Sequence, residues 1–235
     1  IEYSRFGNEE VLDLVKIDST DLDVNQVRVE VHAVGLNPID YKTFEGAKPL
    51  RFLSFITKLR KPSRWFESKS SLFPRGVGRD FSGDITEVGN EVTRFSVGDK
   101  VFGTMISDPG LGTNRGALAT EICVNESEIV LKPEMIDMTH AATMGVAALT
   151  VGGAFRRIGL NSRDTVVISA AAGGIGSIAV QYAVAKGATV IGIASKKNAE
   201  YLKSLGAIPV SYEENIKKAL LSASPTPITK FLDCY

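Results

Sequence analysis

A run of small residues between a predicted strand and a predicted helix has the composition needed to bind a phosphate. Residues 165–176 read Thr-Val-Val-Ile-Ser-Ala-Ala-Ala-Gly-Gly-Ile-Gly, so that an apolar strand ends at Ser169 and a helix is predicted from Gly174. Small residues let the backbone approach a pyrophosphate closely, and the N–H groups at a helix start point at the anion. The residues that we expect to line the phosphate are Ala172, Gly173, Gly174, Ile175 and Gly176.

This turn fits the fingerprint of dinucleotide-binding βαβ units, G-x-G-x-x-G, with Ala171 at the first position and Gly173 and Gly176 at the others. The alanine is a mild change, because this position requires a small residue. A second strand, predicted over 189–193, follows the helix at the distance such a unit requires. Dinucleotide binding is therefore favoured over a tight turn that binds nothing.

The end of the second strand indicates which dinucleotide binds. NAD-specific sites place Asp or Glu there to bond the ribose 2′-hydroxyl. This chain instead reads Ser195-Lys196-Lys197, and no carboxylate occurs before Glu200. A carboxylate ~4 Å from a 2′-phosphate would cost roughly 1–4 kcal/mol. The sequence therefore favours NADPH, although the two lysines are also compatible with a solvated helix start.

Strands and helices alternate strictly around this turn, which predicts a parallel α/β sheet. A single helix is predicted before it over 139–157, with Thr139 as the N-cap and Gly159 as the stop. The predicted strands are 165–169, 189–193, 208–211 and 228–233, and the predicted helices are 174–186, 198–205 and 213–221.

The first half of the chain is predicted to be β-rich. Valines alternate with polar residues from Val27, the period of a half-buried strand, and short strands with little helix are typical of a small barrel or sandwich. We place the boundary near Glu128, giving domains 1–128 and 129–235. The predicted strands are 27–33, 82–88, 100–104, 120–124 and 129–131.

Residues 47–75 fit neither half, because they combine large apolar residues with many bases. Long loops of this kind are uncommon in compact domains and often form lids or binding loops. Three interpretations stay open: an insertion packed on the barrel, a lid over the substrate, and a membrane-surface or partner site.

Composition excludes several classes of function. Lys plus Arg and Asp plus Glu number 27 each, so the basic excess of a nucleic-acid-binding protein is absent. No apolar run reaches the ~18 residues of a membrane span, and the first residues do not resemble a signal peptide. Two cysteines suit a reducing compartment. We expect a cytoplasmic protein acting on a small molecule, with a homodimer as the default assembly.

Several stretches resemble the zinc-independent medium-chain dehydrogenases and reductases, in their quinone oxidoreductase-like branch. The resemblance covers nearly the whole chain in the right order. The stretches that carry it are residues 34–40, 78–83, 97–103 and 168–177, with Ala188 and Gly206-Ala207 beyond them.

This resemblance implies a β-rich GroES-like barrel followed by a Rossmann α/β doubly wound parallel sheet, with the active site in the cleft between them. It also implies NADPH-dependent reduction of quinones or of α,β-unsaturated carbonyl compounds by hydride transfer. Asn37 matches a position lining the substrate cleft, and Thr150 matches one near the nicotinamide. Ser195 and Lys197 lie in the region that holds the 2′-phosphate, and Tyr212 matches a residue flanking the adenosine.

The chain departs from this family in three places. The basic residue that this branch often carries falls at Asn198, which moves its role to Lys196 or Lys197. Related enoyl reductases have a tyrosine where this chain has Ala47-Lys48, which argues against fatty-acyl reduction. Family members continue beyond the fourth Rossmann strand, where this chain stops. We therefore expect an incomplete Rossmann domain that retains the adenosine half and turns over poorly alone.

The chemistry is predicted to need no metal. Zinc-dependent relatives use Cys and His ligands, whereas this chain has Asn37 to Asp40 and Arg79-Asp80 at the equivalent places. Tyr41 is a conceivable proton donor, with packing as the alternative role. Asp40 and Asp80 are expected to hold backbone turns. The competing hypothesis is a dinucleotide-binding protein without turnover that acts through an interaction surface at residues 47–75.

Overall fold

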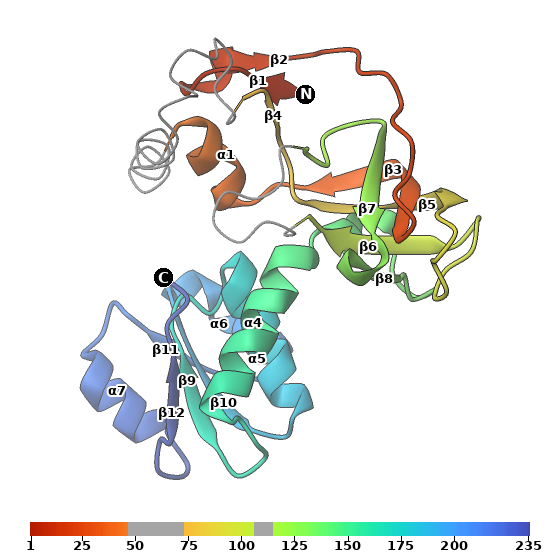
Figure 1. The fold of residues 1–235 in the computed structure, drawn as a ribbon. Coiled ribbons are helices and arrows are strands. Elements are labelled where there is room, and N and C mark those ends of the chain that lie inside the picture. The colour runs from red at the N-terminus through yellow and green to blue at the C-terminus, as the bar shows by residue number, and fades with distance from the viewer. Residues whose placement is uncertain (47–72, 106–114) are drawn as a thin grey trace, which may run out of the picture. The chain divides into compact units, whose positions relative to one another are not determined.

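The computed structural model describes residues 1–46, 73–105 and 115–235, and the chain divides into two compact units, Ile1–Val146 and Ala147–Tyr235 (Figure 1). This division falls later than the boundary expected near Glu128. The reason is that residues after Glu128 still pair and pack with the first unit, as shown below. Residues 47–72, and with them most of the expected insertion and its three interpretations, lie outside the described residues.

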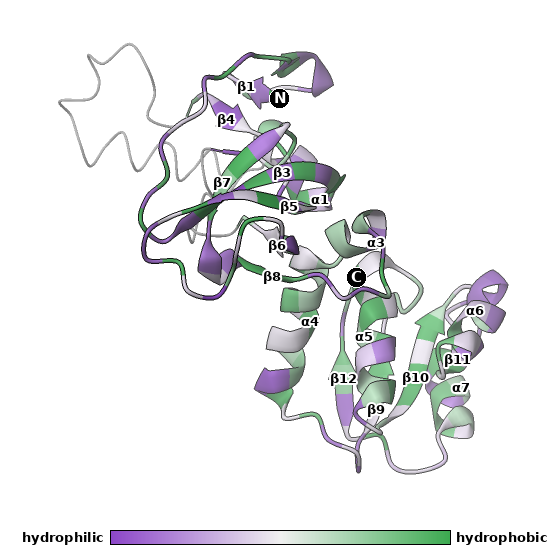
Figure 2. Cartoon of the chain, turned by 90° about the vertical axis from the view of Figure 1, so that its right-hand side faces the viewer, coloured by the Kyte–Doolittle hydropathy of each residue, from purple (hydrophilic) through white to green (hydrophobic). Residues whose placement is uncertain are grey.

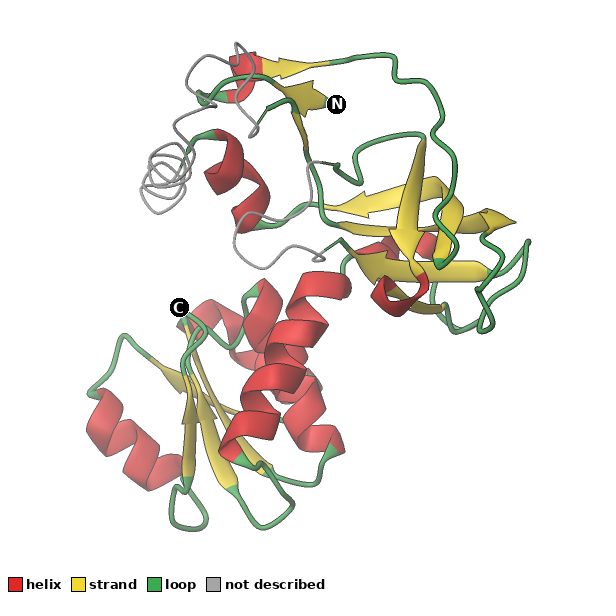
Figure 3. Cartoon of the chain, viewed as in Figure 1, coloured by secondary structure: helices red, strands yellow, loops and turns green. Residues whose placement is uncertain are grey.

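The first unit is built on a five-stranded antiparallel sheet with strand order β7-β3-β5-β6-β8 (Figure 3). Its core side chains alternate along β3, where Val27 and Val29 are fully buried and pack with Phe81 and Ile85. The alternation predicted from the sequence is therefore confirmed. The strands are β3 (Gln26–Gly35), β5 (Asp80–Val88), β6 (Lys100–Thr104), β7 (Glu121–Asn125) and β8 (Ile129–Leu131), with a 3-10 turn, η3 (Glu126–Glu128), before β8.

Four short elements of this unit were not expected from the sequence. Three two-residue strands form a small antiparallel sheet with order β2-β1-β4, and a 3-10 turn precedes β2. Elements of two or three residues carry no periodic pattern, so sequence reasoning has nothing to detect. They are β1 (Glu2–Tyr3), η1 (Glu9–Val11), β2 (Leu12–Asp13) and β4 (Arg75–Gly76).

The helix predicted over 139–157 is in fact two helices, α3 (Met138–Ala142) and α4 (Gly145–Ile158). The N-cap of α3 is Asp137, not Thr139, because its carboxylate accepts from the backbone N–H of His140 at 2.7 Å. The expected stop at Gly159 is confirmed, since that residue has a φ of +63°. Helix α3 packs against β3 and β5, which places it in the first unit.

The second unit contains a four-stranded parallel sheet with order β11-β10-β9-β12. Every strand and helix predicted from residue 165 onward exists, with bounds shifted by a few residues at most. The strands are β9 (Thr165–Ile168), β10 (Thr189–Ala194), β11 (Ile208–Ser211) and β12 (Lys230–Leu232). The helices are α5 (Gly174–Ala185), η4 (Lys196–Asn198), α6 (Ala199–Ser204) and α7 (Ile216–Ala223).

Helices cover both faces of this sheet. One core joins side chains of α4, α5 and α6 to alternate residues of β9 and β10, such as Val166 and Val190. The other core joins α7 to the intervening residues, such as Val167 and Ile191. Figure 2 shows the resulting hydrophobic colour along β9 and β10. Strands buried on both faces explain why the sequence reads as apolar runs there.

Two further observations concern the chain as a whole. No helix within residues 1–46, 73–105 and 115–235 is long and apolar enough to cross a membrane. Both cysteines are free: Cys123 is buried, and Cys234 is half-buried.

Candidate functional site

The turn between β9 and α5 has the geometry of a phosphate-binding loop. Ala170 has a φ of +43°, the left-handed region that non-glycine residues rarely adopt. Its carbonyl accepts from Gly173 N–H at 2.9 Å, which closes the turn. Ala171 is fully buried, and its N–H donates to the carbonyl of Ile193 in β10 at 3.0 Å. The small first residue of the fingerprint therefore serves strand packing.

The first turn of α5 offers N–H groups to an external partner. Gly173 is the N-cap and has no side chain to cap the helix, so the N–H groups of Gly174, Ile175 and Gly176 have no intrahelical acceptor. A Cβ added to Gly174 would have no heavy atom within 4 Å. The space beside Gly174 at this helix start is thus open, and the helix dipole adds positive potential there.

Gly176 has a different role in the same motif. A Cβ on this residue would lie 2.2 Å from the carbonyl oxygen of Ala170 and 2.8 Å from the Cα of Ala171. The residue is buried, and only glycine lets α5 approach the end of β9 so closely. Within one motif, Gly174 therefore borders open space, whereas Gly176 permits helix-to-strand packing.

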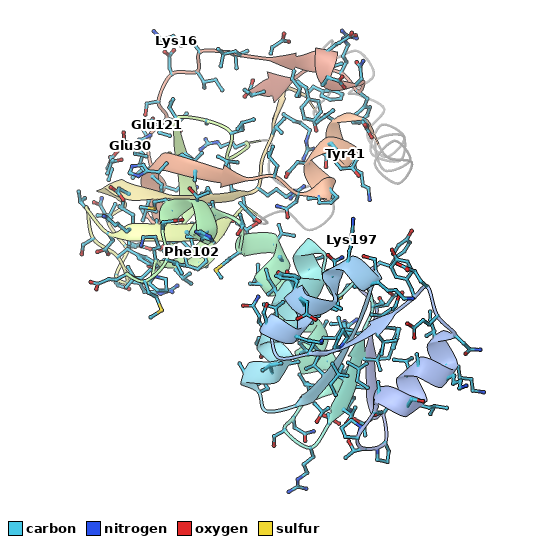
Figure 4. The ribbon with its side chains drawn as sticks, turned by 180° about the vertical axis from the view of Figure 1, so that it is seen from behind. Lys16, Glu30, Tyr41, Phe102, Glu121 and Lys197 are labelled. Atoms are coloured by element: carbon cyan, nitrogen blue, oxygen red, sulfur yellow. The ribbon has the colours of Figure 1, made fainter. Side chains whose placement is uncertain are left out.

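The residues expected to hold the 2′-phosphate follow β10 directly. Ser195 is the N-cap of η4, and its hydroxyl accepts from Asn198 Nδ2 at 3.1 Å. Lys196 and Lys197 are both exposed. Figure 4 shows Lys197 projecting away from the body of its unit, and no described residue forms an ion pair with it.

Two carboxylates that sequence reasoning missed lie beside Lys196. Its Nζ lies 3.7 Å from Glu214 Oε1, and its backbone N–H donates to Glu213 Oε1 at 3.3 Å. Both acids follow β11, the neighbouring strand, whereas the cofactor prediction rested only on the residues after β10. The signal was available, because parallel neighbours end at the same edge of a sheet. Lys196 is thus partly neutralised, and Lys197 is not.

Tyr212 lies at this same edge of the sheet. Its backbone N–H donates to the carbonyl of Ala194 at the end of β10 at 3.2 Å, and its ring is exposed. A cavity of about 140 Å³ lies at this edge, lined by Ser195 and Lys196 after β10, by residues 209–211 of β11, by Glu214, and by Ala199 and Leu202 of α6. The structure therefore places Ser195, Lys196, Lys197 and Tyr212 at the same edge of the sheet.

The candidate residues of the first unit lie on one helix, α1 (Pro38–Phe44), that the sequence reading missed. Tyr41 was expected just after a turn, but it lies in this helix, four residues after the N-cap Asn37 and on the same face. Its ring is exposed, and its hydroxyl has no partner among the described residues (Figure 4). Pro38 occupies the first helical position, where its fixed φ suits the start of a helix.

Asn37 is held by two carboxylates. Its Nδ2 donates to Asp80 Oδ2 at 2.9 Å, and its backbone N–H donates to Asp40 Oδ2 at 2.7 Å. Because a carboxylate can only accept, the amide group of Asn37 must turn its NH₂ toward Asp80. The amide oxygen then faces the first turn of α1, where the Asn37 side chain and Asp40 form a capping box.

Asp80 also fixes the start of α4. It is fully buried, and its two oxygens lie 2.9 and 3.0 Å from the backbone N–H of Val146, where a negative charge is favourable. A Cβ on Gly145 would lie 2.4 Å from Asp80 Oδ1, so glycine is required there. The expectation that Asp40 and Asp80 hold backbone turns is confirmed. Thr150 lies further along α4, in the second unit, with an exposed side chain.

Asp40 is a buried titratable group beside these residues. Burial raises the pKa of its carboxyl above the ordinary value, although the Asn37 N–H and the Arg79 guanidinium oppose this rise. Among the described residues, no three His, Cys, Asp or Glu side chains come together as metal ligands. His140 instead pairs with the N-cap Asp137, with Nδ1 2.8 Å from Oδ1.

The chain matches the alcohol dehydrogenase GroES-like domain over residues 23–134. The structure of the quinone oxidoreductase from Coxiella burnetii is 35% identical, with a TM-score of 0.74, and the match covers 99% of this chain and 67% of that one. These likenesses confirm the predicted order of folds, a GroES-like β-rich domain followed by a Rossmann-type parallel sheet.

Two curated relatives are similar at the sequence level. The mitochondrial NAD(P)H oxidoreductase RTN4IP1 of Mus musculus is 30% identical over 84% of this chain and 50% of its own length. The chloroplastic NADPH-dependent alkenal/one oxidoreductase of Arabidopsis thaliana is 29% identical over 92% of this chain and 53% of its own length. The chain thus spans about half the length of these relatives.

Proposed function

Because the chain belongs to the medium-chain dehydrogenase/reductase family, in its quinone oxidoreductase-like branch, we propose that it takes part in NADPH-dependent reduction of quinones or α,β-unsaturated carbonyl compounds without zinc. Relatives named as quinone and alkenal/one oxidoreductases support this class of reaction. The observation that carries the proposal is the open helix N-terminus at Gly174.

The residues of the β9–α5 turn fit the pyrophosphate of a dinucleotide. A cradle of N–H groups faces space that a Cβ on Gly174 would enter without touching protein. Backbone N–H groups at a helix start are suited to a dianionic pyrophosphate, because donors and dipole act together. Ala172, Gly173, Gly174, Ile175 and Gly176 would form this cradle, with Gly176 acting through packing.

The charged residues after β10 support a preference for binding NADPH over NADH. Lys197 carries a positive charge with no ion-pair partner in the described part of the chain, and Lys196 lies beside it. A 2′-phosphate would be attracted by the positive charges of both lysines and repelled by the carboxylate of Glu214, whose Oε1 lies 3.7 Å from Lys196 Nζ. We therefore assign the larger share of 2′-phosphate binding to Lys197. Ser195 and Tyr212 would border the phosphate and the adenosine.

When bound, NADPH supplies a hydride from its nicotinamide ring, and the protein contributes orientation and exclusion of water. Asn37, held by Asp80, is a side chain of the first unit that we assign to the substrate. The hydroxyl of Tyr41 can donate a proton to a reduced enone. Within the second unit, Thr150, exposed on α4, is the side chain that we assign to the nicotinamide.

The test is NADPH consumption with a panel of small quinones and alkenals, followed through the absorbance of the reduced nicotinamide. It uses the longest protein that contains this sequence, because the 235 residues alone are expected to turn over poorly. We expect oxidation of NADPH with at least one member of the panel. Tyr41→Phe should slow the reduction of alkenals more than that of quinones, because a reduced alkenal must be protonated on carbon, whereas a reduced quinone is protonated on oxygen. Saturable NADPH binding with no consumption by any compound would contradict the proposal. That result would favour the competing hypothesis of an interaction surface at 47–75.

A further inference from the structure

A half-buried arginine, Arg79, lies beside the candidate residues of the first unit. It directly precedes β5, and the next residue, Asp80, accepts from Asn37 Nδ2 at 2.9 Å. The backbone carbonyl of Arg79 accepts from the N–H of Met105 at 3.0 Å, just after β6. The backbone of Arg79 is therefore fixed between two strands, next to the carboxylate that holds Asn37.

The side chain of Arg79 faces α1. Arg79 lines a cavity of about 20 Å³ together with Asp40 and Thr43 of this helix. The guanidinium is close enough to Asp40 to lower the pKa of that carboxyl. The cavity has room for about one water molecule, so a substrate would have to meet Arg79 from outside it.

Most of the hydrogen-bonding capacity of Arg79 is unused. A guanidinium has five N–H donors, and in the described part of the chain one long bond uses this group, from Nη1 to the carbonyl of Met105 at 3.4 Å. No described carboxylate forms an ion pair with it. None of its nitrogen atoms is buried without a partner among the described residues. The remaining donors therefore reach solvent.

The neighbouring acids leave the charge of Arg79 available. Asp40 forms no ion pair with it, and burial raises the pKa of Asp40 even though the guanidinium lowers it. Asp80 is fully buried, and both of its oxygens already accept from N–H groups of other residues. A negative charge that develops beside α1 would thus meet a guanidinium with donors to spare.

The proposed reduction creates such a charge. When an enone is reduced, a hydride with its electron pair, taken from the reduced nicotinamide, adds to the β-carbon. The π electrons of the C=C bond then move toward the carbonyl oxygen, and a proton from water later adds to the α-carbon. A hydrogen-bond donor placed at that oxygen stabilises the transition state more than the ground state.

We propose that Arg79 is a catalytic residue whose guanidinium donates a hydrogen bond to the carbonyl oxygen of an enone or quinone and stabilises the negative charge that reduction places there. This inference rests on the proposed function, because it requires a substrate that accepts a hydride at this site. It restricts the substrates to compounds whose reduction puts charge on an oxygen atom.

The test measures kcat and KM for NADPH-dependent reduction in the longest protein that contains this sequence, with NADPH affinity from calorimetry. Arg79→Gln, which removes the charge, should lower kcat by about a hundredfold or more. NADPH affinity and the unfolding midpoint should change little, because the guanidinium makes one long bond to the protein. Arg79→Lys restores the charge without the planar fork and should recover part of the lost rate.

The loss of rate should follow the charge on the substrate oxygen. Electron-withdrawing groups on a quinone take up part of that charge, so the loss in Arg79→Gln should be smallest for such quinones and largest for enones. A residue that acts only on the fold would slow all substrates equally. Should Arg79→Gln fail to fold, the same ranking is measured in Arg79→Lys.

Arg94→Gln is the matched control. Arg94 Nη1 also donates to a backbone carbonyl, that of Glu126 at 3.2 Å, but it follows the other end of β5. This variant should keep the kcat of the unmodified protein. Unchanged kcat in Arg79→Gln, or an equal loss for every substrate, would overturn the role of Arg79 and leave the proposed function intact. Absence of NADPH consumption by the unmodified protein would overturn both.

Discussion

The two glycines of the phosphate turn should separate ligand binding from folding. In Gly174→Val, the branched side chain enters open space, because no heavy atom lies within 4 Å of the added Cβ. The backbone there is not left-handed, so valine can adopt it. The fold should survive, while the side chain blocks approach of the pyrophosphate to the N–H groups. Hydrogen bonds to charged groups contribute about 1.5–3 kcal/mol each. Loss of one such bond weakens binding by about ten- to hundredfold.

In Gly176→Ala, the same motif should respond in the opposite way. The added Cβ would lie 2.2 Å from the Ala170 carbonyl oxygen, so α5 must move away from β9. Overpacking of this kind costs about 1–3 kcal/mol. For a chain of this size, each kcal/mol lowers the unfolding midpoint by about 2–4 °C.

The assay pairs NADPH titration by calorimetry with thermal unfolding followed by circular dichroism. Gly174→Val should lose affinity with an unchanged midpoint, and Gly176→Ala should lose stability. Wild-type affinity in Gly174→Val would refute our placement of the pyrophosphate. A large loss of stability in the same variant would refute the assignment of open space in front of α5.

Three other changes have defined outcomes. Lys197→Glu should weaken NADPH binding by about tenfold or more and leave NADH binding nearly unchanged. Lys196→Glu should weaken NADPH binding less, because Lys196 already pairs with Glu214. Equal losses of NADPH affinity in the two variants, measured by calorimetry, would contradict this. Because burial raises the pKa of Asp40, the folded chain holds that proton more tightly than the unfolded chain, and stability falls as pH rises from the ordinary Asp range through the raised pKa. Asp40→Asn should flatten this part of the midpoint-against-pH curve, and an unchanged curve would argue against a buried proton. Dialysis against a chelator should alter neither the unfolding midpoint nor NADPH consumption; stoichiometric zinc in the untreated sample, or loss of either property, would contradict a metal-free mechanism.

The parts of this fold that depend on local pattern were predictable from the sequence. The strands at 100–104, 129–131 and 208–211 have the predicted bounds, because each is a short apolar run between turn residues. The turn between β9 and α5 was likewise predictable. Small residues between a strand and a helix usually mark a tight turn at which the helix packs closely against the strand. Here local sequence and tertiary structure agree.

The parts that were missed depend on residues distant in sequence. One helix was predicted over 139–157, but Asp80 caps a new helix at Val146 from a strand far earlier in the chain. The orientation of the Asn37 amide depends on the same carboxylate. Glu213 and Glu214, the acids beside Lys196, follow β11, whereas the cofactor prediction considered only the residues after β10. Periodicity cannot reveal such contacts, because it reports only on neighbours along the chain.

The most direct test of our central claim is the pair of dissociation constants for NADPH and NADH, measured by calorimetry at low salt on the full chain. We predict that NADPH binds at least about tenfold more tightly than NADH, because the 2′-phosphate meets Lys197 and Lys196 after β10. Equal dissociation constants, or tighter binding of NADH, would contradict this assignment and would point to Glu213 and Glu214 as the groups that face the ribose.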